Sequence, residues 1–132
     1  MMVLSFNHAA KAIMSWTFPA STSLEQAHAE MAKVAAVPPV STFLIGAEPN
    51  RVVVKGHSLL DVAYWVVGDQ VLVGVVNLDY ASHNGTIHIN LPVSVSGMDC
   101  QPWGALSWGV SNHTLTLYGV AGLASSFVVL NM

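Results

Sequence analysis

Residues 60–78 read LDVAYWVVGDQVLVGVVNL, and this stretch decides the fold. Two runs rich in β-branched and aromatic residues, Leu60–Val67 and Val71–Leu78, flank the pair Gly68-Asp69. Two such runs around a short Gly-containing pair are typical of a β-hairpin. The second run is apolar at successive positions, which indicates a strand that is buried on both faces. We therefore expect this hairpin at the centre of a packed β structure.

Further strands are predicted on both sides of the hairpin. Thr86–Leu91 alternates cleanly between apolar and polar residues, as a half-buried strand does. Other candidate strands are Val40–Ile45, Arg51–Lys55, Cys100–Trp103, Thr114–Tyr118 and Phe127–Asn131. Many short strands with frequent turn signals predict a mainly β chain, an antiparallel sandwich of about 7–8 strands with one N-terminal α-helix packed on it.

The helix is predicted at Ser23–Ala36, where apolar residues recur at helical spacing and Pro38-Pro39 follows. Before it, Ala12–Phe18 forms a short apolar run that we interpret as a strand. This gives an N-terminal strand and helix over residues 1–38 and a sandwich over 39–132, folded as one unit. One strand, one helix and then only strands is the plan of the last β/α unit of a larger domain, so we expect a missing domain upstream.

The composition excludes several classes of protein. Charged residues make up 8% of the chain, against roughly 25% in an average soluble domain. The net charge of −3 and the four dispersed Lys and Arg residues argue against a nucleic-acid partner. No apolar run is long enough for a membrane span, and no signal peptide is readable. With 53% hydrophobic residues, the chain should expose apolar surface, which favours an interface with a partner or with another copy of itself.

Two parts of the sequence resemble fungal glycoside hydrolases. His8–Pro19 and the helix after it are similar to the last β/α unit of a (β/α)₈ barrel, in which the final strand carries a Trp toward the sugar. Asp61–Trp65 and Val71–Asn77, with Leu91-Pro92 and Trp103-Gly104 later, resemble the β-sandwich appended to such barrels. The resemblance implies an extracellular protein. The size of the chain also suggests an association with small mushroom immunomodulatory proteins.

The residues themselves give little support to catalysis. A glycosidase needs two positioned carboxyl groups, and the resemblance implies that these would come from strands that this chain lacks. The seven acidic residues form no pair that the sequence can place together, although Asp61 could bind backbone or a Trp N–H group. Six histidines raise the alternative of a metal site, with His83 and His88 meeting across a turn, but no third ligand is implied. We therefore predict no enzyme activity, no metal and no cofactor.

The candidate binding residues are aromatic or apolar. Exposed aromatic rings stack on sugar faces, so a carbohydrate-binding surface would use Trp103, Trp108 and Tyr80, although tryptophans that close the core are the more common case. Self-association is predicted through Val3–Phe18, a strand that could pair with another chain. The residues expected at this interface are Phe6, Ile13, Met14, Trp16 and Phe18. Possible N-glycosylation sites are Asn84 and Asn112.

The sequence thus predicts a non-catalytic binding or interaction protein, derived from the C-terminal sandwich of a fungal glycoside hydrolase. It should form homo-oligomers, and an immunomodulatory role with a glycan or cell-surface receptor as partner is consistent with this. The alternatives are a carbohydrate-binding module and, less favoured, a residual glycoside hydrolase.

Overall fold

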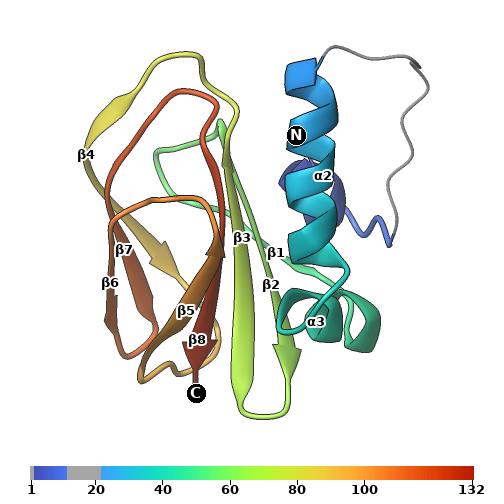
Figure 1. The fold of residues 1–132 in the computed structure, drawn as a ribbon. Coiled ribbons are helices and arrows are strands. Elements are labelled where there is room, and N and C mark those ends of the chain that lie inside the picture. Colours follow the sequence, from blue (N-terminus) through green and yellow to red (C-terminus); the bar gives the residue numbers. More distant parts are fainter. Residues whose placement is uncertain (1, 12–21) are drawn as a thin grey trace.

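The computed structural model describes residues 2–11 and 22–132. Within these residues three helices precede eight strands (Figure 1). The helices are α1 (Met2–Asn7), α2 (Thr22–Ala35) and α3 (Val40–Gly46). The strands are β1 (Asn50–Val52), β2 (Leu60–Val67), β3 (Gln70–Asn77), β4 (His83–Asn90), β5 (Gly97–Trp103), β6 (Trp108–Ser111), β7 (Thr114–Val120) and β8 (Ser125–Asn131).

The strands form two antiparallel sheets, which confirms the predicted sandwich. One sheet has the order β1-β2-β3-β8-β5 and the other the order β4-β7-β6. The hairpin lies where the sequence predicts it, with Val67 opposite Gln70 and Gly68 at φ 60° in the turn. Glycine adopts this left-handed conformation without steric cost. In Figure 1 the helices lie on one side of the five-stranded sheet and the three-stranded sheet lies on the other.

The central sheet is apolar on both faces, and each face builds its own core. Val73 of β3, Val62 of β2 and Val128 of β8 point toward the three-stranded sheet and pack with Ile89 and Leu117. The alternate residues of the same strands point toward the helices. This second core contains Val3, Phe6, Met31, Phe43, Trp65, Leu72 and Phe127. Since successive residues of a strand face opposite sides, unbroken apolar runs such as β3 require a cover on both.

The N-terminal segment is helical where we expected a strand for pairing with another chain. Val3, Phe6 and Asn7 of α1 are buried, and Phe6 packs on Phe127 with ring centroids 6.3 Å apart. The spacing of three and four residues puts these side chains on one helical face. The expected strand is therefore wrong for residues 3–11, and the predicted strand at Ala12–Phe18 lies outside the described residues.

Val40–Ile45 is also helical rather than extended. Its β-branched residues suggested a strand, but Val40, Phe43 and Leu44 are buried at positions i, i+3 and i+4 of α3. Contacts to β2 and to α2 stabilise this helix against its modest propensity. The predicted helix is observed as α2, which buries Met31 and half-buries Val34 and Ala35, so it packs through its C-terminal half.

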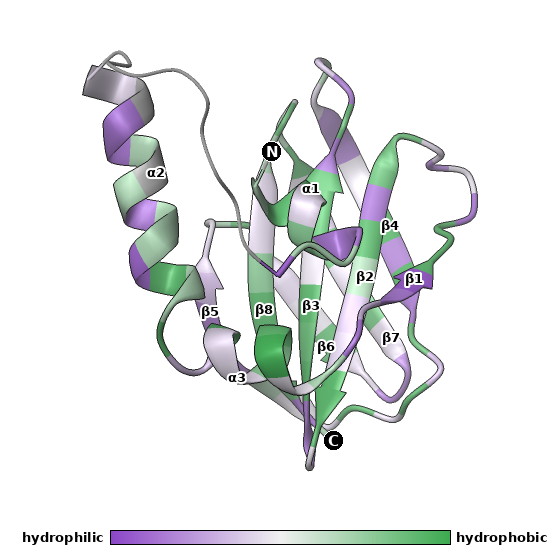
Figure 2. Cartoon of the chain, turned by 90° about the vertical axis from the view of Figure 1, so that its right-hand side faces the viewer, coloured by the Kyte–Doolittle hydropathy of each residue, from purple (hydrophilic) through white to green (hydrophobic). Residues whose placement is uncertain are grey.

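Gly74 is the residue that lets α1 approach the sheet closely. A Cβ atom at this position would collide with Asn7 Oδ1 and lie 3.1 Å from the Phe127 ring. Figure 2 shows α1 lying across β2 and β3 at this point. A glycine in the middle of a central strand often marks such a close contact.

We predict that Gly74→Ala destabilises the chain, because the new methyl group displaces Asn7 and Phe127. Overpacking of this kind costs about 1–3 kcal/mol of the free energy of unfolding, measurable by urea denaturation. The matched control is Gly97→Ala in β5, where a Cβ meets no atom within 4 Å. Equal effects of the two substitutions would contradict the close packing at Gly74.

Candidate functional site

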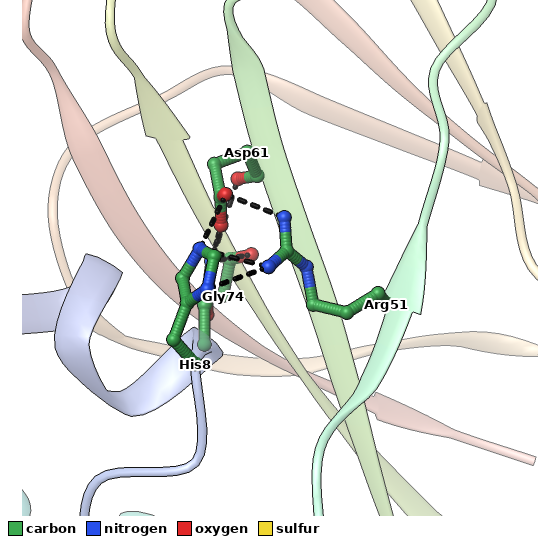
Figure 3. A network of polar contacts seen from close by, with 5 residues as sticks. His8, Arg51, Asp61 and Gly74 are labelled. Atoms are coloured by element: carbon green, nitrogen blue, oxygen red, sulfur yellow. Dashed lines mark hydrogen bonds and ion pairs between the residues drawn. The ribbon is translucent and has the colours of Figure 1, made fainter.

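A network of polar side chains at the base of α1 surrounds the most buried carboxylate. The Asp61 side chain on β2 is 6% exposed and receives a hydrogen bond from Arg51 of β1, with 2.6 Å between Nη2 and Oδ2. His8 Nε2 lies 2.9 Å from the same oxygen, and Asn7 Nδ2 donates to Oδ1 at 2.9 Å. Asn7 Nδ2 also donates to the Gly74 carbonyl oxygen at 3.1 Å. Figure 3 shows His8 and Arg51 converging on Asp61 from different elements.

The geometry assigns this network a structural role. Arg51 Nη1 lies 2.8 Å from both ring nitrogens of His8, so the imidazole lies against the guanidinium as well as against the Asp61 carboxylate. Both Asp61 oxygens then have donors within the chain. Buried charges persist in proteins when they are paired and hydrogen-bonded in this way. The network fixes α1 and β1 on β2, and the predicted Asp61 contacts are replaced by these three partners.

A polar pocket of about 290 Å³ opens where the loops of the two sheets meet. His57, in the loop between β1 and β2, touches His83 at the start of β4 edge to face, with ring centroids 4.6 Å apart. Asn77 and Asp79 contribute to the wall from the end of β3 and the loop beyond it. Sequence reasoning missed this pocket, because its residues are polar, lie in separate loops and share no motif.

The predicted meeting of His83 with His88 does not occur. Both residues lie on β4, where His83 is opposite Val120 and His88 is opposite Thr116. The extended strand separates them, and the His88 ring contacts the Thr116 hydroxyl at 3.3 Å instead. Within residues 2–11 and 22–132, no three His, Cys, Asp or Glu residues are grouped as metal ligands.

An apolar groove of about 440 Å³ lies between α1, α2 and α3. Phe6, Met31 and Leu44 contribute to its lining, and Ile45 of α3 lies at the groove with 83% of its surface exposed. Exposed apolar patches of sufficient size mark contacts with a partner or a ligand. Figure 2 shows apolar residues at the C-terminal end of α2 and in the last turn of α3.

The predicted sugar-binding aromatics do not form one platform. Trp103 ends β5, is half-buried against the helix-side core and donates from Nε1 to Ser125 Oγ at 3.2 Å. Trp108 begins β6 and packs against the core between the sheets. Tyr80 lies in the loop after β3 and is 87% exposed. The two tryptophans therefore serve different cores, and Tyr80 alone presents its ring to solvent.

The other predicted site residues are placed as follows. Phe6 is 4% exposed inside the chain, so its side chain is a core residue and the expected contact with another copy is corrected. Ile13, Met14, Trp16 and Phe18 lie outside the described residues. Asn84 is exposed on β4, and Asn112 is exposed in the turn after β6 at φ 53°. Both sequons are thus accessible on the surface.

The surroundings of the single cysteine disfavour its thiolate form. Burial raises the pKa of Cys100, and the negative charge and hydrogen bond of Asp99 raise it further. The thiolate is the nucleophilic form of cysteine, so a raised pKa lowers its reactivity at neutral pH.

No helix in the described part of the chain has the length and apolar character needed to cross a membrane.

We predict that Arg51→Ala lowers the free energy of unfolding by about 1–3 kcal/mol, because Asp61 keeps only part of its hydrogen bonding. The loss should fall below the full cost of breaking a buried ion pair, since the Arg51 side chain is 47% exposed. Lys33→Ala is the control, because its ion pair with Glu30 lies at the surface and should contribute under about 0.5 kcal/mol. Urea denaturation measures the free energy of unfolding of both variants. An Arg51→Ala variant as stable as the wild type would refute the anchoring role of Arg51.

The alkylation rate of Cys100 should rise with pH at a higher midpoint in the folded chain than in the same chain unfolded in urea. Asp99→Asn should move this midpoint only part of the way down, because burial is the larger cause of the raised pKa. Iodoacetamide labelling followed by mass spectrometry measures the rates. A folded midpoint at or below the unfolded value would show that the thiol is activated.

Comparison with known proteins identifies a structure with a similar fold but no family to which the chain can be assigned. No protein-family model and no curated protein matches the chain. Among solved structures, the debranching enzyme from Nostoc punctiforme is similar, with a TM-score of 0.58 at 14% sequence identity. The match covers 83% of this chain and 21% of that enzyme, so the chain spans about a fifth of its length. At this identity the likeness shows a shared fold, that of one part of a larger enzyme.

Proposed function

We propose that this protein is a non-catalytic interaction domain that self-associates through the surface formed by α2 and α3. The observation that carries the proposal is the apolar groove between α1, α2 and α3 with Ile45 exposed beside it. The likeness to one part of a debranching enzyme supports an origin as an accessory sandwich of a glycoside hydrolase.

The positions of the acidic residues support the absence of catalysis. All seven lie within the described residues. Asp61 is the buried one, and Arg51, His8 and Asn7 occupy its oxygens. Asp79 lines the polar pocket without a second carboxylate in the lining. Glycoside hydrolysis by a carboxylate pair needs an acid and a base or nucleophile on either side of the bond, and neither the Asp61 network nor the polar pocket holds such a pair.

The shape of the α2–α3 surface favours a second copy as the partner. Ile45 projects from α3 beside a groove lined by Met31, Ala35 and Leu44. Because the exposed Ile45 side chain and the apolar groove lie on the same surface, two copies related by a two-fold axis could each insert Ile45 into the groove of the other. Burying an isoleucine from water contributes about 1.5–3 kcal/mol, twice in a symmetric pair. Val37, 49% exposed after α2, would extend the contact.

The surroundings of the groove add little charge to such an interface. Lys11 is the charged residue in the groove lining, and its ammonium group is already bound to the carbonyl oxygens of Leu44 and Ala47 and to Glu48. A partner therefore does not have to supply an acidic group. Receptor or glycan recognition, immunomodulation and an extracellular location belong to this proposal as predictions from the sequence.

We predict that Ile45→Glu weakens self-association at least about tenfold, because it places a charge in an apolar contact. Val53→Glu is the matched control, since Val53 is 94% exposed between β1 and β2 and does not line the groove. Size-exclusion chromatography with light scattering, across a concentration series, gives the dissociation constants. Far-UV circular dichroism checks that both variants fold.

A wild-type chain that stays monomeric at every concentration would overturn self-association, as would equal effects of the two substitutions. Turnover of aryl glycosides that co-purifies with the wild-type chain and is lost in a carboxylate variant would overturn the non-catalytic assignment. The two parts of the proposal thus fail separately.

A further inference from the structure

We propose that the polar pocket between the two sheets binds a single neutral sugar ring. The pocket has about 290 Å³ of space, near the lower end of the range for small-molecule sites. It lies away from the α2–α3 surface and shares no lining residue with the apolar groove. The inference therefore does not depend on self-association.

One wall of the pocket is fixed by hydrogen bonds made by both the amide nitrogen and the amide oxygen of Asn77. Asn77 Nδ2 donates to the carbonyl oxygens of Ala121 at 3.1 Å and Ala81 at 3.4 Å, and Asn77 Oδ1 accepts from the Asp79 N–H at 3.0 Å. Asn77 itself is 5% exposed. It fixes the loop after β3 against the loop before β8, so the wall is already formed before a ligand enters.

Other polar atoms in the lining remain available to a ligand. The rings of His57 and His83 touch each other, and neither ring makes a hydrogen bond to a described residue; the same holds for the Ser58 hydroxyl. Asp79 accepts the Ala81 N–H through Oδ1, which leaves Oδ2 open. Ser82 Oγ accepts from the Gly122 N–H and keeps its own proton for donation. The pocket therefore presents both donors and acceptors.

The character of the lining selects a neutral hydroxylated ring. Neither Lys nor Arg lines the pocket and Asp79 does, so an anionic ligand would meet a like charge. Leu60, Ile87 and Val120 add apolar surface beside the polar atoms. A pyranose has hydroxyl groups at its edge and C–H groups on its faces, and it matches both halves of this lining. Each sugar hydroxyl that enters the site exchanges hydrogen bonds to water for hydrogen bonds to protein groups. A ring whose hydroxyls do not match these groups leaves them unpaired and binds more weakly, which makes the site specific.

The two histidines in the pocket lining come from different sheets of the sandwich. His57 precedes β2 of the five-stranded sheet, and His83 begins β4 of the three-stranded sheet. Their edge-to-face contact therefore spans the two sheets within the lining of the pocket. A sugar hydroxyl that bonds to both rings would join the same two elements.

The test is a titration of the ¹⁵N-labelled full chain with the methyl glycosides of glucose, galactose, mannose and N-acetylglucosamine, followed by NMR. At least one should cause saturable shifts of the amides of Ser58, Ser82 and His83, with a millimolar dissociation constant. Asp79→Asn keeps the Oδ1 acceptor for Ala81 but replaces the open carboxylate oxygen, and should weaken binding at least about tenfold. His113→Ala, an exposed histidine outside the pocket, should bind as the wild type does.

Oligosaccharides that end in the bound sugar distinguish the two possible sources of the ligand. Tighter binding of the oligosaccharide indicates the terminal unit of a glycan, and equal or weaker binding indicates a free monosaccharide. The proposal is overturned if no glycoside shifts the pocket amides, if the shifts centre on Trp103 or Trp108, or if Asp79→Asn binds like the wild type. Ile45→Glu should bind the sugar unchanged, which separates this result from the proposed self-association.

Discussion

The structure depends on one constraint: the central hairpin is apolar on both faces, and water must be excluded from both. The three-stranded sheet covers one face, where Val73 and Val75 lie. On the other face Trp65 and Leu72 would be exposed without α1 and α3. The helices are therefore the second half of the packing rather than an appendage. An unpartnered sheet face of this kind would otherwise be a site of aggregation.

Covering a sheet with a helix of six residues requires more than apolar contact, because so short a helix has little stability of its own. Asp61 on β2 attaches α1 to the sheet more firmly, because its carboxylate binds Arg51, His8 and Asn7. Gly74 supplies the room for Asn7 on the neighbouring strand. The polar network and the glycine thus act on the same contact. They explain a buried charge without invoking catalysis.

The sandwich could be predicted because its signal is local. Gly68-Asp69 sets the hairpin, and alternation along Thr86–Leu91 sets the face of β4. The short helices could not be predicted in the same way, since Val40–Ile45 has strand-forming residues and becomes helical only through contacts with distant elements. The polar pocket depends on His57 and His83 meeting from two sheets, which no spacing in the sequence encodes. Trp103 and Trp108 were predicted to bind sugar because they are aromatic, yet each packs against a different hydrophobic core.

The functional surfaces follow from this layered plan. The α2–α3 surface belongs to the helical layer, while the polar pocket lies where the loops of the two sheets meet. Both depend on the helices and sheets folding together. Native-state hydrogen exchange measured by NMR tests this most directly, by comparing the His8 and Ala10 amides, which bond to carbonyl oxygens of α1, with the amides of β3. We expect all of them to open with the same free energy. Rapid exchange at His8 and Ala10 while β3 stays protected would contradict a helical layer that is integral to the fold.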